Sequence, residues 1–323
     1  MKTVAITSAF VPPEWVSAHG FEPRTVVPQA PEDNGLARSE GVCSFARGEL
    51  TEALAHPEHD AVILASTCDQ MRRGAELFSP TTKAVLALHI PATWRTPAAL
   101  QGYIEELQRL GRFLVRLGGR SPSPERLANE MRRHDTLRAS LRALRGSLSP
   151  GEFARALIAY QRGNPLPDGR DAPFTVKGPA IALVGCPLTL RELRLFDSVE
   201  HAGGYVALNA TELGELSLPA PFDRRALSSD PFGELATRYF GTIPGVFRRP
   251  NSELYLTLGT LFRERDIAGC LFIRYLWCDL WHAELARLTE WACLPVLDLH
   301  LSGREDSTAR LSTRIEAFLE ILR

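Results

Sequence analysis

The sequence has no excess of charge of either sign. Its 323 residues carry 37 basic and 38 acidic side chains, which give a formal net charge of −1. A protein that mainly binds nucleic acid needs extra positive charge to neutralise phosphates, so that function is disfavoured. No apolar run approaches the roughly 20 residues that span a membrane, and the apolar residues 4–11 end at Pro12 and Pro13 without a signal-peptide cleavage site. These absences predict a cytoplasmic protein that binds neither nucleic acid nor membrane.

Several motifs of nucleotide-binding and hydrolytic enzymes are also missing. The chain has no G-x-x-x-x-G-K-S/T loop, no G-x-G-x-x-G after its first apolar run, no G-x-S-x-G and no H-E-x-x-H. ATP hydrolysis at a P-loop and a dinucleotide-binding fingerprint are therefore disfavoured. Lysine is scarce as well, with only Lys2, Lys83 and Lys177. We take the excess of arginine to reflect a GC-rich genome rather than anion recognition.

Six cysteines are spread over the whole chain: Cys43, Cys68, Cys186, Cys270, Cys278 and Cys293. None belongs to a C-x-x-C pair, and nothing in the sequence indicates secretion, so a disulfide framework is disfavoured. The cysteines are either small buried hydrophobic residues or metal ligands gathered from distant segments.

Short apolar runs alternate with helical patterns at both ends of the chain. This alternation is typical of parallel strands covered on both faces by helices. We therefore predict an α/β fold with two open parallel-sheet domains, flavodoxin-like or Rossmann-like, and a helical segment between them. The predicted strands contain residues 4–6, 25–27, 61–64 and 84–88 in the first domain, and 180–185, 205–208, 270–273 and 295–299 in the second.

The middle of the chain is predicted to be helical. Thr96-Pro97 and Ser123-Pro124 are typical helix starts, and Ser149 with Glu152 forms a capping-box pattern. Nine arginines along these helices could bind an acidic partner or a nucleotide-bearing thioester, but we expect a solvated polar face: Arg109, Arg112, Arg116, Arg126, Arg132, Arg133, Arg138, Arg142 and Arg145. The predicted domains are residues 1–161, with the helical segment at about 96–161, a linker at 162–176 and residues 177–323.

Ligand sites in open parallel sheets lie beyond the carboxyl ends of the strands. Cys68-Asp69 and Cys278-Asp279 each follow a predicted strand, and Cys43 lies 25 positions before Cys68 on a connection that can return to the same edge. Thiolates are soft ligands suited to iron–sulfur clusters or zinc. Spacing alone does not decide whether these cysteines are metal ligands or incidental buried thiols.

The residues around these cysteines resemble the 2-hydroxyacyl-CoA dehydratase and benzoyl-CoA reductase subunit family. The resemblance covers nearly the whole chain and rests on five ordered segments. They are residues 10–24, Cys43-Ser44-Phe45-Ala46-Arg47, Ser66-Thr67-Cys68-Asp69-Gln70-Met71-Arg72-Arg73, Tyr275-Leu276-Trp277-Cys278-Asp279 and Thr313-Arg314-Ile315-Glu316-Ala317-Phe318-Leu319-Glu320. The chain is shorter than typical members around residues 209–223.

This resemblance implies that Cys43, Cys68 and Cys278 hold a [4Fe-4S] cluster. Three thiolates leave one iron open as a Lewis acid. The resemblance further implies that a low-potential electron converts the carbonyl of a CoA thioester substrate into a ketyl radical that expels hydroxide. The family also implies a homologous partner subunit or a homodimer, and a separate ATP-dependent activator that supplies electrons, which agrees with the missing P-loop.

Other functions stay open at this point. A third branch of the family holds a double-cubane cluster between two identical subunits and reduces small molecules. Alternatively, the chain is a structural or electron-relay partner. A pocket beside Cys43 and Cys68 that fits an acyl thioester favours catalysis, and a cluster sealed by Trp277 and Trp281 favours relay.

No catalytic acid or base is assigned from the sequence. The carboxylates near the motifs are expected to orient ligands or to be solvated: Glu14, Asp69, Asp279 and Glu284. His19 and His282 are expected to be structural, hydrogen-bonded histidines. The remaining cysteines, Cys186, Cys270 and Cys293, are expected to be buried thiols.

Overall fold

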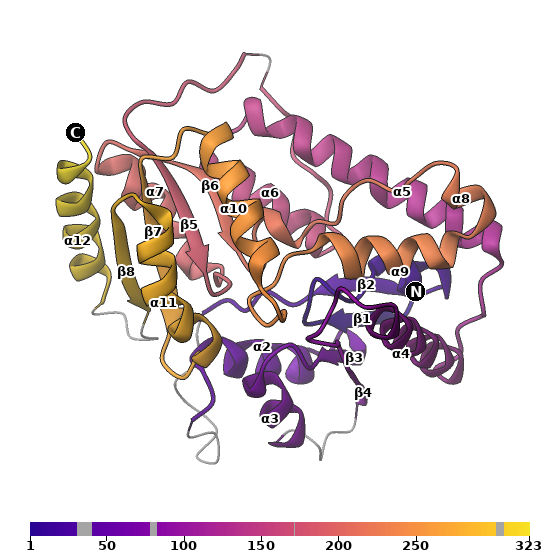
Figure 1. The fold of residues 1–323 in the computed structure, drawn as a ribbon. Helices are drawn as coiled ribbons and strands as arrows, with labels where there is room; N and C mark the ends of the chain where they lie inside the picture. The colour runs from indigo at the N-terminus through magenta and orange to yellow at the C-terminus, as the bar shows by residue number, and fades with distance from the viewer. Residues whose placement is uncertain (31–40, 78–82, 171, 302–306) are drawn as a thin grey trace.

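The computed structural model of the chain describes residues 1–30, 41–77, 83–170, 172–301 and 307–323. Its named strands form two four-stranded sheets in which every neighbouring pair is parallel (Figure 1). The first sheet has the order β2-β1-β3-β4, with β1 at Thr3–Ile6, β2 at Glu22–Thr25, β3 at His59–Ala65 and β4 at Ala84–Leu88. The second has the order β6-β5-β7-β8, with β5 at Ala180–Gly185, β6 at Tyr205–Thr211, β7 at Gly269–Tyr275 and β8 at Val296–Leu301. The predicted fold class is confirmed.

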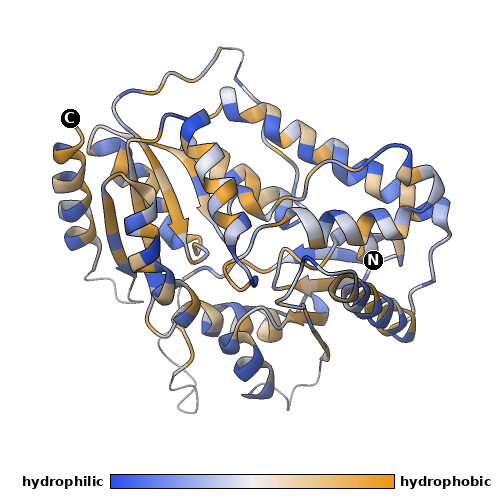
Figure 2. Cartoon of the chain, viewed as in Figure 1, coloured by the Kyte–Doolittle hydropathy of each residue, from blue (hydrophilic) through white to orange (hydrophobic). Residues whose placement is uncertain are grey.

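Two strands differ in extent from the prediction. The prediction placed the second strand at residues 25–27, but β2 comprises Glu22–Thr25, whose side chains are only partly buried at the sheet edge. The apolar Val26 and Val27 follow it, so apolar patterning placed the strand too late. β6 continues to Thr211, three residues beyond the predicted run. The central strands appear as hydrophobic segments in Figure 2, and every residue of β5 is buried.

The helix starts predicted for the middle of the chain are confirmed. Helix α4, Pro97–Arg116, is capped by Thr96, whose side chain accepts the N–H of Ala99. Ser123 caps α5, Pro124–Ala143, in the same way, and the capping box of Ser149 begins α6, Pro150–Gln161. None of the helices in the described part of the chain is long and apolar enough to cross a bilayer.

The remaining helices flank the sheets. They are α1 Pro13–Ala18, α2 Ser44–Ala55, α3 Asp69–Leu77, α7 Arg194–His201, α8 Ala226–Ser229, α9 Pro231–Thr242, α10 Ser252–Glu264, α11 Asp279–Ala292 and α12 Ser307–Ile321. Short 3₁₀ helices lie at Leu144–Gly146, Arg191–Leu193 and Glu215–Ser217.

The two faces of the first sheet enter different cores, because side chains alternate along a strand. Val62 and Leu64 of β3 belong to one cluster of buried residues with Ile181 of β5. Ala61 and Ile63 point to the other face, where they join buried residues of α4 and α9. One face of the first sheet is therefore part of the core that holds the second sheet.

The C-terminal half of the chain completes the core of the first sheet. α9 contacts α4 and α5, and Figure 1 shows the orange α9 beside the dark α4. α6 contacts α5 as well as β6 and α7. The described residues of the predicted linker, 162–176, contain no strand and no helix. The division of the chain into domains at this linker stays a prediction.

A buried ion pair fastens α1 to α5. Arg138 Nη1 lies 2.6 Å from Glu14 Oε1, and both side chains are 0% exposed. Tyr239 of α9 donates its hydroxyl hydrogen to Glu14 Oε2 at 2.7 Å. Burial alone would raise the pKa of Glu14, but the charge and hydrogen bond of Arg138, the charge of His134 and the hydrogen bond from Tyr239 together outweigh it, and the pKa is lowered. The prediction that Arg138 belongs to a solvated face was wrong, because helical spacing does not show that this position faces Glu14 instead of water.

Replacing one partner of this pair tests its contribution. Among the described residues, Glu14→Gln leaves the buried guanidinium of Arg138 with only its longer ion pair to Asp135 at 3.5 Å, so we expect a loss of about 3 kcal/mol in the free energy of unfolding. Chemical denaturation of both proteins measures the difference. As the control, Arg155→Gln removes a half-exposed pair with Asp197 at 3.7 Å and should cost less than about 1 kcal/mol. Equal losses in the two variants would contradict the assignment.

Candidate functional site

A cavity of about 130 Å³ lies where the carboxyl ends of the two sheets face each other. Segments that follow five strands supply much of its lining: residues 7–10 after β1, 67–71 after β3, 186–187 after β5, 212–213 after β6 and 278–281 after β7. Parallel strands deliver the loops at their carboxyl ends to one edge of a sheet. The cavity therefore collects residues from Thr7 to Trp281.

The three cysteines singled out in the sequence all line this cavity. Cys43, Cys68 and Cys278 stand directly before the first residues of α2, α3 and α11. The backbone N–H of Cys43 donates to Gln70 Oε1 at 2.9 Å, which ties the first cysteine segment to the second. The structure thus brings the three thiols to one cavity, and their role as ligands stays a prediction.

Backbone N–H groups point at two of the sulfur atoms. Ala46 donates to Cys43 Sγ and Met71 donates to Cys68 Sγ, each at 3.4 Å. Helix N-termini and such hydrogen bonds favour the thiolate form of cysteine. Burial works against them and dominates, because it raises the pKa of Cys68 to about 12 and that of Cys43 well above its usual range. Without a metal, both side chains are neutral thiols at neutral pH.

A fourth cysteine, Cys186, also lines the cavity. Its Sγ lies 3.2 Å from that of Cys278. The preceding Gly185 has φ +133°, and a Cβ there would lie 2.0 Å from the carbonyl oxygen of Ile273, so only glycine fits. The sequence interpretation of Cys186 as a packed thiol accounts for its burial but missed its place at the site. Its position directly after a predicted strand was the available signal.

The last two cysteines lie elsewhere. Cys270 is fully buried within β7, as predicted. The predicted burial of Cys293 was wrong, because Cys293 is exposed. It follows the last residue of α11 with φ 51°, where the chain leaves the helix at the surface.

The donor set fits an iron–sulfur cluster better than a single metal ion. Within the described residues, no group of three or more His, Cys, Asp or Glu side chains is arranged to hold one ion. Ligands of a cubane bind different irons and therefore need not converge on one point. Cysteine thiolates are the usual protein ligands of such clusters, and hydrogen bonds to sulfur tune their potential. Cys43, Cys68 and Cys278 around one cavity supply such thiolates, and Cys43 and Cys68 also receive N–H hydrogen bonds on their sulfurs.

Two glutamates that the sequence analysis did not select also line the cavity. Glu49 of α2 is buried, and its Oε1 has no hydrogen-bond partner. Burial raises its pKa well above the usual range, and the charge of Glu212 adds to the effect. Glu212 Oε1 accepts the indole N–H of Trp281 at 2.6 Å. Glu212 directly follows β6, so it was missed because the strand was predicted to end three residues too early.

The environment of Glu212 shifts the pKa of its carboxyl to near neutral pH. Its side chain is exposed to the cavity that it lines. Desolvation raises the pKa of Glu212 to about 7, although the hydrogen bond from Trp281 lowers it. Glu212 can therefore give or take a proton at physiological pH.

The carboxylates named from the sequence fall into two groups. Asp69 and Asp279 line the cavity. Glu14 pairs with Arg138, and Glu284 accepts hydrogen bonds from Asn251 and Tyr255. The latter two carboxylates therefore have structural partners.

The two named histidines are hydrogen-bonded, as expected. His19 Nδ1 lies 2.7 Å from the carbonyl oxygen of Trp15, and His282 Nδ1 lies 3.2 Å from Arg274 Nη1. Neither is among the residues that line the cysteine cavity.

The two tryptophans near Cys278 have different environments. Trp277 is 52% exposed and has φ 69°, which is unusual for a bulky side chain. Trp281 is buried and lines the cavity. Trp281 thus covers part of the cysteine cavity, while much of the Trp277 side chain remains in solvent.

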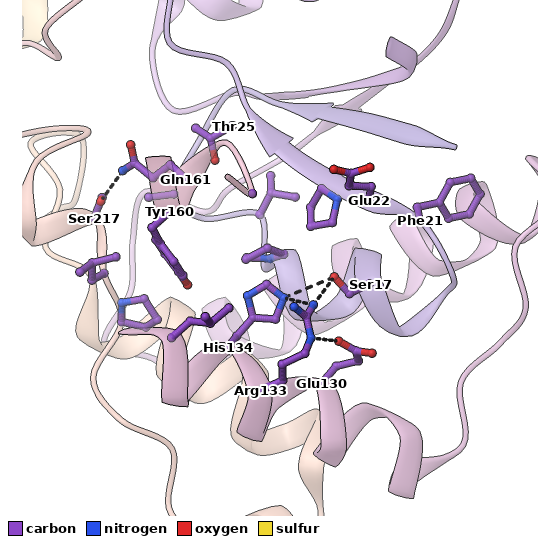
Figure 3. Close-up of a pocket in the computed structure, with 18 of the residues that line it drawn as sticks. Ser17, Phe21, Glu22, Thr25, Glu130, Arg133, His134, Tyr160, Gln161 and Ser217 are labelled. Carbon is purple, nitrogen blue, oxygen red and sulfur yellow. Dashed lines mark hydrogen bonds and ion pairs between the residues drawn. The ribbon is translucent and has the colours of Figure 1, made fainter. Parts of the chain in front are cut away.

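A second pocket of about 450 Å³ adjoins the cavity, since Ser8, Ala9 and Leu213 line both. Figure 3 shows Ser17, Glu130, Arg133 and His134 joined on one wall of this pocket. Within this group, His134 Nε2 lies 3.3 Å from Ser17 Oγ and 3.0 Å from Arg133 Nη2. Burial lowers the pKa of His134 to about 4, so the ring is neutral at neutral pH.

The titration of Glu212 gives a pH dependence of stability. The folded chain holds this proton more tightly than the unfolded chain, so Glu212 makes the free energy of unfolding fall as pH rises from 4.5 to about 7. In Glu212→Gln this decline should become shallower, measured by urea unfolding at several pH values. Glu200→Gln, on the exposed side of α7, should behave as the unmodified chain. A decline of the same size in Glu212→Gln would show that other groups cause it.

Comparison with known proteins identifies the family. The family model described as 2-hydroxyglutaryl-CoA dehydratase, D-component, matches residues 8–154 and 151–322. A comparison with curated proteins finds no match. Among solved structures, the periplasmic zinc-binding protein TroA from Treponema pallidum aligns over 98% of this chain and 99% of its own, with 10% identity and a TM-score of 0.25, and nothing is inferred from so distant a likeness. The family match spans nearly the whole sequence, and the chain therefore belongs to the 2-hydroxyglutaryl-CoA dehydratase D-component family.

Proposed function

We propose that this chain is the iron–sulfur subunit of a 2-hydroxyacyl-CoA dehydratase or of a related benzoyl-CoA reductase. The observation that carries the proposal is the meeting of Cys43, Cys68 and Cys278 at one cavity, although they come from three distant segments. Membership in the family supports the dehydratase component. The family also points to a separate activator component, and the absence of a P-loop in this chain agrees with an external ATP-dependent source of electrons.

Cys43, Cys68 and Cys278 are the proposed ligands of a [4Fe-4S] cluster. When bound, such a cluster supplies single electrons at low potential and, with three protein ligands, an open iron that acts as a Lewis acid. Binding must displace the protons of thiols whose pKa is raised by burial. The N–H groups of Ala46 and Met71 then offset the charge on two of the sulfurs.

The side chains around the cavity are suited to a reaction that releases hydroxide. Phe45, Phe247 and Trp281 line the cavity and limit the access of water. The carboxyl of Glu212 has a pKa of about 7, and the pKa of the Glu49 carboxyl is raised well above its usual range. A departing hydroxide is a strong base, so either carboxyl can protonate it as it leaves. In the proposed reaction, one electron added to the thioester carbonyl gives a ketyl radical, and loss of the 2-hydroxyl follows.

The pocket next to the cavity provides space for the rest of a thioester. It is the larger of the two, and its wall includes Arg126 and Arg133, of which Arg133 is paired with Glu130 at 2.8 Å. We propose that the acyl group occupies the cysteine cavity and that the CoA arm extends through this pocket. Space for substrate beside the thiols supports a catalytic role over a purely electron-relaying or structural one.

Two family branches accommodate the same ligand set. A double-cubane cluster shared by two identical subunits also takes three cysteines from each chain, and a hetero-oligomer takes one cluster per subunit. A homodimer or a homologous partner subunit is proposed accordingly, and the two branches differ in whether the cluster requires a second copy of this chain.

Iron content tests the proposed site directly. We expect about four irons per chain, with acid-labile sulfide, after anaerobic purification or reconstitution. Cys43→Ser, Cys68→Ser and Cys278→Ser should each lose most of this iron and the EPR signal of the reduced protein.

Two cysteines outside the cavity serve as matched controls. Cys270→Ser and Cys293→Ser remove a buried and an exposed thiol, respectively, and should keep the iron. An iron-free protein after anaerobic reconstitution, or equal iron in all five variants, would refute the proposed cluster.

A further inference from the structure

Cys186 and Cys278 form a close thiol pair. The Cys186 thiol donates to Cys278 Sγ at 3.2 Å, whereas a disulfide bond measures about 2.05 Å. An approach of roughly 1 Å would therefore bring the two sulfurs to bonding distance. Small side-chain rotations supply such a movement.

The backbone holds both cysteines at neighbouring positions. Cys186 directly follows β5, and Cys278 follows the adjacent strand β7. The two strands are in register at Gly185 and Ile273, and the N–H of Cys186 donates to the carbonyl oxygen of Ile273 at 2.9 Å. The pair thus lies at the carboxyl ends of two adjacent central strands and not on two independent loops.

The distance between the two sulfur atoms distinguishes a redox pair from two cluster ligands. Thiolates that bind different irons of a cubane diverge from each other, because each one points outward from its own corner. Sulfurs 3.2 Å apart do not occupy two such positions. Cys186 is therefore placed to react with Cys278 rather than to act as a further ligand beside it.

We propose that Cys186 and Cys278 are a reversible disulfide site in the cluster-free chain, formed by a peroxide. The more accessible Cys278 attacks one peroxide oxygen, which gives a sulfenic acid and releases water. Cys186 sulfur then displaces the hydroxyl from Cys278 and forms the S–S bond, and a second water leaves. Two thiols lose two electrons in total, and hydrogen peroxide is reduced to two waters. A dithiol reductant restores both thiols.

The disulfide has two consequences for the site. It protects Cys278 from irreversible oxidation to sulfinic acid. It also engages the sulfur proposed as a cluster ligand, so the oxidised chain should not accept iron until it is reduced. This second consequence rests on the proposed function, whereas formation of the disulfide does not.

Peptide mapping tests the pair without any cluster. The iron-free full-length chain is treated with equimolar hydrogen peroxide, alkylated in denaturant and digested. We expect loss of two alkylated thiols and a linked peptide pair that contains Cys186 and Cys278, both reversed by a dithiol. In Cys186→Ala and Cys186→Ser, equimolar peroxide should leave Cys278 as the sulfenic acid, and a second equivalent should take it to the sulfinic acid. The exposed-site control Cys293→Ser should still form the link. A link between other cysteines, or none, overturns the proposal.

Iron reconstitution separates this proposal from that of the cluster. If Cys186 is only a redox partner, the reduced Cys186→Ala and Cys186→Ser variants bind as much iron as the unmodified chain. Loss of iron in both would make Cys186 a ligand and overturn the redox assignment. If the unmodified chain itself binds no iron, the cluster proposal fails, and the peptide map still decides the disulfide.

Discussion

The direction of the strands is the constraint on which this site depends. All strands within each sheet are parallel, so each sheet presents its connecting loops at one edge. The two edges face each other because one face of the first sheet shares its buried core with the second sheet. The two halves of the chain are also joined by α9, a helix of the C-terminal half that packs on α4 and α5. Residues as distant as Cys43 and Cys278 thereby line the same cavity.

Burial at this junction determines the chemical state of its groups. The cavity is surrounded by aromatic and aliphatic side chains, and thiols and carboxyls inside it favour their neutral forms. A site of this kind keeps its protons until a cation replaces them. Two cysteine sulfurs nevertheless accept backbone N–H groups, so the arrangement that resists an isolated charge also contains the donors that a bound, anionic thiolate requires.

The sequence carried enough information for the sheets and for three of the cavity cysteines. Strand periodicity located Cys68 and Cys278 beyond strand ends, and helix caps such as Thr96 and Ser149 follow simple local chemistry. Three other features depend on tertiary contacts. Cys186 is distinguished from an ordinary buried thiol only by the nearby sulfur of Cys278. To predict that Glu212 lines the cavity, one must know where β6 ends. To predict that Arg138 is buried, one must know that its partner Glu14 lies on α1. Periodicity shows which side of an element is polar but does not identify what that side meets.

The relation between the two cavities bears on whether the chain performs chemistry or only passes electrons. A relay needs its redox centre sealed from substrate, and Trp281 does cover one side of the cysteine cavity. However, Ser8, Ala9 and Leu213 line both that cavity and a pocket more than three times as large, at about 450 Å³ against 130 Å³. The cavity with the thiols and the larger pocket therefore adjoin at these three residues. The proposed CoA thioester, with its compact acyl head and long polar arm, would place the head in the cavity and the arm in the adjoining pocket.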